Sequence, residues 1–208
     1  MTWRVSGLNM GTVVIDNALT GLLRRIEMSK QYLSCAETAK LVRAALKESF
    51  PGVKFSVRSS VYSGGASINV NYVDGPTYDQ VKAVVGMFEG SYFDGMTDYK
   101  GSNYGSLDGQ EVRFGADFIF VNRSFSVGLF TSLVADACKY YGYTMPTIAQ
   151  GYSGAYIADN IGYETNRRIM EKVSEYSADD TAESATLKRV AFLGDDGYGY
   201  GAVGRLVA

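Results

Sequence analysis

The chain has 208 residues, of which 46% are hydrophobic and 20% charged, and its net charge at neutral pH is −2. This length suits one domain with extensions or two small domains, and the slightly acidic balance gives no general attraction to nucleic acids or anionic membranes. The sequence contains no histidine, which excludes serine–histidine and cysteine–histidine nucleophile systems and any histidine-ligated zinc site.

The first 30 residues predict a short apolar run at residues 13–15 and then a helix. The helical spacing is carried by Leu19, Leu22, Leu23 and Ile26, followed by the pair Arg24–Arg25. This segment lacks the charged start and long apolar middle of a signal peptide, and no apolar run approaches the roughly 20 residues of a spanning helix. We therefore expect a soluble intracellular protein without a membrane partner, with residues 1–33 as an N-terminal extension.

The stretch SCAETAKLVRAALKESFPG predicts a helix from Ser34 to Phe50. Ser34 and Glu37 form a capping box at its start, and Pro51–Gly52 ends it. The stripe expected to face the core is Cys35, Thr38, Val42, Leu46 and Phe50. A second side carries Lys40, Arg43 and Lys47. This side is either a solvated helix face or a contact for nucleic-acid backbone, together with the pairs Arg24–Arg25 and Arg167–Arg168.

Residues 53–61 and 66–73 alternate with period two around Ser63–Gly64–Gly65, which predicts a β-hairpin. One row is apolar and the other is polar but nearly uncharged. The polar row is Lys54, Ser56, Arg58, Ser60, Ser67, Asn69 and Asn71. It is either a solvated face or a binding surface, because neutral hydrogen-bonding groups with two positive charges suit a protein partner or phosphates and base edges.

DGPTYDQVKAVVGMF predicts a turn and then a second helix with a capping box at Thr77 and Gln80. Its expected core residues are Tyr78, Val81, Val85 and Phe88. Residues 89–111 have no clear periodicity and predict a long loop with at most a short pairing segment. The acidic residues there, Asp94, Asp98, Asp108 and Glu111, could hold Mg²⁺ or Ca²⁺ with their oxygens. The simpler interpretation needs no metal, because Asp94–Gly95 and Asp108–Gly109 form turns.

VRFGADFIFVNR predicts a third, centrally buried strand, and SFSVGLFTSLVADACKYYGY a third helix that ends near Gly142. TNRRIMEKVSEY predicts an amphipathic helix with Ile169, Met170, Val173 and Tyr176 inward. TAESATLKRVAFL predicts another helix, and GDDGYGYGAVGRLVA a flexible or docking tail. The tyrosine- and glycine-rich segments 91–104 and 151–163 have the composition of binding loops or of irregular connections.

These elements predict an α+β fold in which an antiparallel sheet has helices packed on one face. We expect the domain to span residues 34–143 and a helical C-terminal extension to span 144–208. Cys35 and Cys138 lie among apolar neighbours in two helices. This placement predicts buried free thiols, with a disulfide between them left open. No phosphate-binding loop stands between a strand and a helix, so we expect no cofactor.

The run CAETAKLVRAALKESFPG, the hairpin FSVRSSVYSGGASINVNYVDGPT, the motif FDGM and the stretch RFGADFIFVNRSFS resemble a known family over residues 34–142. It is the large polyvalent protein-associated domain, type twenty-nine. The resemblance implies a protein of a phage or conjugative element that acts in the host cytoplasm and blunts host defences. It supplies no catalytic residues.

We therefore expect a non-catalytic interaction protein, with a host defence complex such as a CRISPR effector as its partner. One alternative is a nucleic-acid-binding module that uses the hairpin face with Arg58 and the side of the helix that carries Lys40, Arg43 and Lys47. The other is carboxylate- or metal-dependent phosphate chemistry. The tyrosine-rich segments also leave a homodimer open. The expected partner surface is Lys54, Ser56, Arg58, Ser60, Ser67, Asn69, Asn71, Tyr92, Tyr99 and Tyr104.

Overall fold

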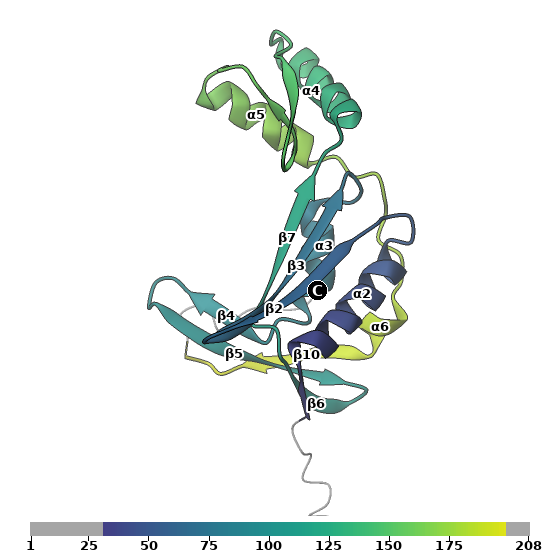
Figure 1. Cartoon of the computed structure of the whole chain (residues 1–208), viewed down its shortest axis with the longest axis vertical. Helices are drawn as coiled ribbons and strands as arrows, with labels where there is room; N and C mark the ends of the chain where they lie inside the picture. The colour runs from purple at the N-terminus through teal and green to yellow at the C-terminus, as the bar shows by residue number, and fades with distance from the viewer. Residues whose placement is uncertain (1–30, 199–208) are drawn as a thin grey trace, which may run out of the picture.

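A computed structural model describes residues 31–198 of the chain (Figure 1). The helix expected before residue 30 and the pair Arg24–Arg25 lie outside these residues, as does most of the expected tail. Helices and strands are mixed along the chain, and the α+β class is confirmed. No helix of residues 31–198 has both the length and the apolar character needed to cross a bilayer.

The first sheet has three strands in the order β2 (Ser56–Tyr62), β3 (Gly65–Val73) and β7 (Phe118–Ser124). β2 and β3 form the predicted antiparallel hairpin, with Val57 opposite Val70. β3 and β7 are parallel, with Ile68 opposite Ile119. The expectation of a purely antiparallel sheet is therefore wrong, because a long crossover joins β3 to β7 and returns the chain to the same end of the sheet.

Helices α2 (Cys35–Ser49) and α3 (Tyr78–Gly86) pack against one face of this sheet (Figure 1). Both predicted capping boxes are present, at Ser34 with Glu37 and at Thr77 with Gln80. The predicted core stripe of α2 is buried along its whole length, as are Val81, Val85 and Phe88. Tyr78 is 47% exposed, so its assignment to the core is wrong. Tyr78 is the first residue of α3 and directly follows the turn.

The second sheet contains β1 (Gln31–Leu33), β6 (Gln110–Phe114), β5 (Tyr99–Leu107) and β10 (Val190–Asp195), and β4 (Ser91–Asp94) also pairs with β5. The long loop expected at residues 89–111 is therefore wrong. Glycine weakens an isolated strand, but here aromatic rings of neighbouring strands cover it. A Cβ on Gly101 would lie 2.2 Å from the ring of Tyr92, its partner across β4 and β5.

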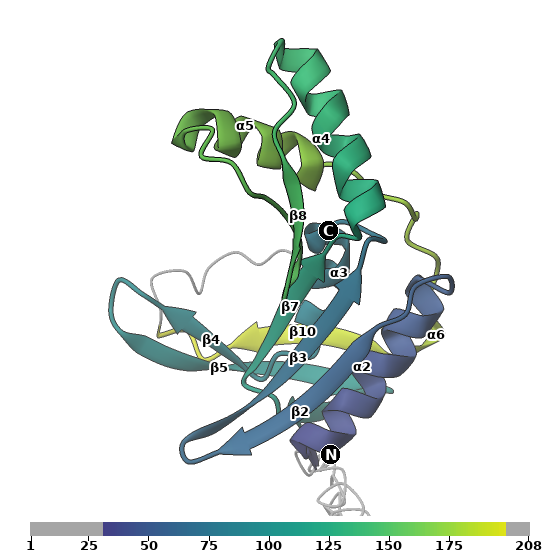
Figure 2. The ribbon, with the colours of Figure 1, turned by 45° about the horizontal axis from the view of Figure 1, so that its top comes forward.

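A smaller unit lies beyond the ends of β3 and β7 (Figure 2). It consists of α4 (Val127–Tyr141), the hairpin β8 (Ile148–Gly151) and β9 (Gly154–Ile157), and α5 (Tyr163–Ser174). It has its own hydrophobic cluster, which includes Phe130, Val134, Ile169 and Val173. Met170 is 37% exposed and Tyr176 half-buried, so only part of the predicted inward face of α5 packs.

The chain then returns to the first unit. α6 (Ala185–Lys188) is a single turn beside α2, and β10 follows it (Figure 1). The helix expected at residues 181–193 is thus wrong over most of its length, because residues 190–195 pair antiparallel with β5. Cys35 and Cys138 are free, buried thiols in the two separate clusters, which excludes a disulfide between them in this structure.

Candidate interaction surface

The polar row predicted for the hairpin lies on the sheet face opposite α2 and α3. The strand register places Ser56 opposite Asn71, Arg58 opposite Asn69 and Ser60 opposite Ser67. Most of these residues are exposed, but Ser67 is only 6% exposed and cannot offer its hydroxyl to a partner. Lys54 precedes β2 and lies apart from the row. Ser67 and Lys54 were therefore wrongly assigned to the predicted surface.

Strand β7 extends this face with residues that sequence reasoning missed. Its parallel register places Phe120 beside Asn69 and Asn122 beside Asn71. The ring of Phe120 is 51% exposed. We predicted a centrally buried strand here, but β7 lies at the edge of its sheet, and every second side chain faces away from the helices.

The turn of the β8–β9 hairpin overhangs one end of this face. Gln150, Tyr152 and Ser153 of the turn border a groove of about 820 Å³, and Asn71, Asn122 and Ser124 border it from the strands. The side chain of Tyr152 is fully exposed. We name the groove and the polar face together the open face. It consists of Ser56, Arg58, Ser60, Asn69, Asn71, Phe120, Asn122, Gln150, Tyr152 and Ser153.

The hairpin is held against the strands at close range. The Ala155 amide donates to the Phe125 carbonyl at 3.0 Å, and a Cβ on Gly154 would lie 2.9 Å from Cβ of Ser124. Gly154 also has a φ of +117°, a conformation that favours glycine. The groove is therefore formed before any partner arrives.

The predicted contact residues Tyr92, Tyr99 and Tyr104 lie elsewhere, in β4 and β5, and are half-buried. The hydroxyls of Tyr92 and Tyr99 donate to the Asp196 carboxylate at 2.6 and 3.0 Å. The hydrogen bond to Asp196 raises the pKa of Tyr99. These two hydroxyls thus fix the segment after β10 instead of facing a partner. No local signal in the sequence points to Asp196, because its partners Tyr92 and Tyr99 are about a hundred residues away.

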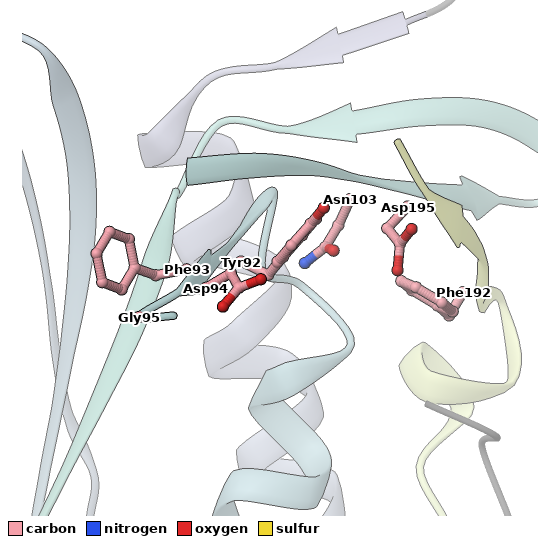
Figure 3. A pocket seen from close by; sticks show the side chains of 7 residues that line it. All are labelled: Tyr92, Phe93, Asp94, Gly95, Asn103, Phe192 and Asp195. Carbon is pink, nitrogen blue, oxygen red and sulfur yellow. The ribbon is translucent and has the colours of Figure 1, made fainter. Parts of the chain in front are cut away.

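A small pocket lies next to this network, between β4, β5 and β10 (Figure 3). Its volume is about 240 Å³, and Tyr92, Phe93, Asn103 and Phe192 are among the residues that line it. The nearby carboxyl of Asp196 experiences opposing effects. Burial raises its pKa, but hydrogen bonds from Tyr92, Ser102 and Tyr99 outweigh burial and hold the pKa below its usual range. The pocket is too small for most organic ligands.

The predicted cations of α2 are exposed. Arg43 and Lys47 line a hollow of about 470 Å³ together with Lys54, so the structure groups Lys54 with these cations instead of with the polar row. Arg43 donates to the Val57 carbonyl at 2.8 Å. The other described pair, Arg167–Arg168, is neutralised by Glu164 and Glu171 on the same helix and does not extend a basic stripe.

The three aspartates singled out in the 89–111 segment lie in or directly beside turns, whereas Glu111 lies in strand β6. Asp98 and Asp108 have φ values of +52° and +54°, and Asp94 accepts a hydrogen bond from the Met96 amide at 2.9 Å. Asp108 also pairs with Arg189 at 2.6 Å. Among residues 31–198, no three potential metal-binding side chains of the Cys, Asp or Glu type lie together. The turn interpretation accounts for Asp94 and Asp108, the two aspartates that precede glycine.

Comparison with known families identifies part of the chain. Residues 33–126 match the family model described as large polyvalent protein associated domain 29, which confirms the resemblance seen in the sequence. The match implies a protein associated with a phage or a mobile genetic element. It covers α2, the whole first sheet and strands β4 to β6. No curated protein and no solved structure matches the chain.

Proposed function

We propose that this protein is a non-catalytic inhibitor that binds a protein of a host defence complex, such as a CRISPR effector, through the open face. It acts in the host cytoplasm and needs no cofactor. The observation that carries the proposal is the composition of that face. Neutral hydrogen-bonding side chains surround two exposed aromatic rings, Phe120 and Tyr152.

This composition supports a protein partner over a nucleic acid. Exposed tyrosine and phenylalanine supply contact area at low entropic cost, and serine and asparagine adapt their hydrogen bonds to the partner. Affinity for nucleic acid depends mainly on cations that neutralise phosphates. The open face carries one cation, Arg58, on its polar row, and Arg123, which also lines the groove, is engaged with the carbonyls of Gly75 and Tyr176.

The geometry supports binding without rearrangement. The register of three strands fixes the polar side chains, and the close contact between Gly154 and Ser124 fixes the hairpin turn. A surface that is already ordered loses little conformational entropy on binding. Defence as the target rests on the family match alone, since the domain is associated with large polyvalent proteins.

Capture from host cells with the tagged full chain tests this proposal. We expect a defined host protein to bind the wild-type chain, and Arg58→Glu/Tyr152→Ala to weaken its binding about tenfold or more. The melting temperature should stay nearly unchanged, because both side chains are exposed. The control Arg113→Glu/Tyr163→Ala makes the same chemical changes at exposed positions outside the open face and should bind normally. Equal loss in both variants would contradict the proposal.

A nucleic-acid-binding module stays the alternative, because the Lys40, Arg43 and Lys47 side of α2 is exposed. It predicts binding of an oligonucleotide that falls steeply with salt. A gel shift at two salt concentrations separates the two functions, and we expect no shift of (dT)20 at the higher one. A tight, salt-sensitive complex with the oligonucleotide that Arg58→Glu abolishes would show that the open face binds a nucleic acid and not a protein.

A further inference from the structure

We propose that the hollow between α2 and the start of β2 is a second docking site, which binds an acidic segment of a partner protein. The hollow is lined by Arg43 and Lys47 of α2, Lys54 of the connecting segment, and Pro51, Gly52, Val53, Phe55 and Val57. It lies on the helix-covered side of the hairpin, away from the open face. The proposal therefore does not depend on the proposed function.

The cations of the hollow form no ion pair among the described residues, although the Asp179 carboxylate lies near Gly52, 3.7 Å from where a Cβ on that glycine would be. None of Arg43, Lys47 and Lys54 has a carboxylate within ion-pair distance among residues 31–198. Several other cations in this part of the chain pair with carboxylates, as in Lys82–Glu89 and Lys100–Asp117. Three like charges around one hollow repel each other, and an anionic ligand relieves this repulsion.

The apolar floor identifies the class of ligand. Besides its cations, the hollow is lined by Pro51, Val53, Phe55 and Val57 and by the backbone of Gly52. Phosphates offer nothing to an apolar floor, and bound nucleic acid is held by polar donors and stacking rings. An acidic segment with interspersed apolar side chains matches both features, because its carboxylates meet the cations while its apolar groups cover Val53 and Phe55.

The position of the hollow suits an extended segment. It borders the first residues of strand β2, which is at the edge of its sheet. Arg43 donates a hydrogen bond to the Val57 carbonyl at 2.8 Å. Arg43 is thus fixed by the fold and presents the rest of its guanidinium to the hollow. Lys47 and Lys54 make no such internal bond among the described residues and are the cations to vary in a test.

A library of 12-residue peptides with matched apolar content and varied charge tests the site on the full chain. We expect the selected peptides to be rich in Asp and Glu. We expect Lys47→Glu/Lys54→Glu to weaken their binding about tenfold or more. The control Arg113→Glu/Lys139→Glu changes the net charge equally at other exposed cations and should bind the peptides like the wild type.

The Arg58→Glu/Tyr152→Ala variant should also bind the peptides normally, so that failure of the open face and failure of the hollow are distinguishable. Three outcomes would overturn the docking site: selection of no peptide above background, selection of peptides without acidic bias, or equal binding to both charge-reversed variants. Displacement of the selected peptides by (dT)20 with higher affinity would assign the hollow to nucleic acid instead.

Discussion

The guanidinium of Arg123 lies 4.5 Å from the centroid of the Phe125 ring. Its Nη2 also donates to the carbonyl oxygens of Gly75 and Tyr176, at 2.9 and 2.8 Å. One side chain therefore connects the end of β7, the turn after β3 and the segment after α5. It is a principal link between the two hydrophobic clusters of the protein.

Arg123→Met should lower the free energy of unfolding by about 2 kcal/mol, because the carbonyls of Asp74, Gly75, Ser174 and Tyr176 lose a charged donor while the methyl thioether still covers Phe125. The stability of Arg123→Lys should lie between those of the wild type and Arg123→Met, since the ammonium group of lysine cannot reproduce the planar, forked set of donors of a guanidinium. Denaturant unfolding measures both. Arg113→Met, at an exposed arginine, should change stability by less than about 0.5 kcal/mol. An equal effect at both positions would contradict this role.

Stability in acid should depend on Asp117. Its carboxylate accepts hydrogen bonds from Lys100 Nζ at 2.8 Å and from Ala66 and Ser91, both at 2.9 Å. Burial raises the pKa of this carboxyl, but the hydrogen bonds from its three partners outweigh burial, so the pKa is lowered on folding. A lowered pKa stabilises the folded state above the unfolded value of about 3.9 and loses this effect as the pH falls.

We therefore expect Asp117→Asn to cost about 2 kcal/mol at pH 7, and the difference from wild type to shrink between about pH 5 and pH 2. Denaturant titrations across that range measure it. Asp98→Asn is a suitable control, because Asp98 is exposed and asparagine tolerates its left-handed conformation. A difference that grows on acidification would contradict a pKa of Asp117 that is lowered on folding.

Gly90 should not tolerate a side chain. A Cβ at this position would lie 2.0 Å from the Phe114 carbonyl oxygen, while the Gly90 amide donates to Ala116 at 2.8 Å. Gly90→Ala must separate these segments and should cost about 3 kcal/mol. Gly86→Ala meets no atom within 4 Å and should be neutral or slightly stabilising at the end of α3. Thermal unfolding compares the two variants. Similar melting temperatures would contradict the close approach of Gly90 to the Phe114 carbonyl.

The two thiols should report on the two clusters separately. Cys35 and Cys138 are 4% and 3% exposed, and burial raises the pKa of both, so neither should react quickly with iodoacetamide in the native protein. The cluster around Cys138 is much the smaller of the two. We expect Cys138 to be alkylated first in mild denaturant. Equal rates, measured by mass spectrometry of peptides, would indicate one cooperative unit.

Local signals in the sequence predicted part of this fold. Ser34 with Glu37 and Thr77 with Gln80 satisfy helix ends within one turn, so the sequence nearby is sufficient to predict them. β5 was missed because Gly101 is favourable in a strand only when the ring of Tyr92 covers it. β10 was missed because its partner β5 is more than eighty residues away.

The sequence predicted only part of the candidate site, as it predicted only part of the fold. The alternation of the hairpin predicts which side chains share a face, and the register confirms the pairs of Arg58 with Asn69 and Ser56 with Asn71. Phe120 and Tyr152 were missed, because their exposure depends on how β7 and the β8–β9 hairpin pack. The separation of Lys54 from this face also depends on tertiary structure, since β2 begins only at Ser56 and Lys54 lines the hollow beside α2.

The pairing of β10 with β5 also bears on how the protein is made. The second sheet begins with residues 31–33 but gains β10 only when residue 195 has left the ribosome. Throughout synthesis of the α4–α5 unit, the nascent chain therefore carries residues 103–107 of β5 without the strand that later pairs with them. An unpaired strand edge invites pairing with other chains, so we expect the chain to be open to such pairing during this stretch of translation.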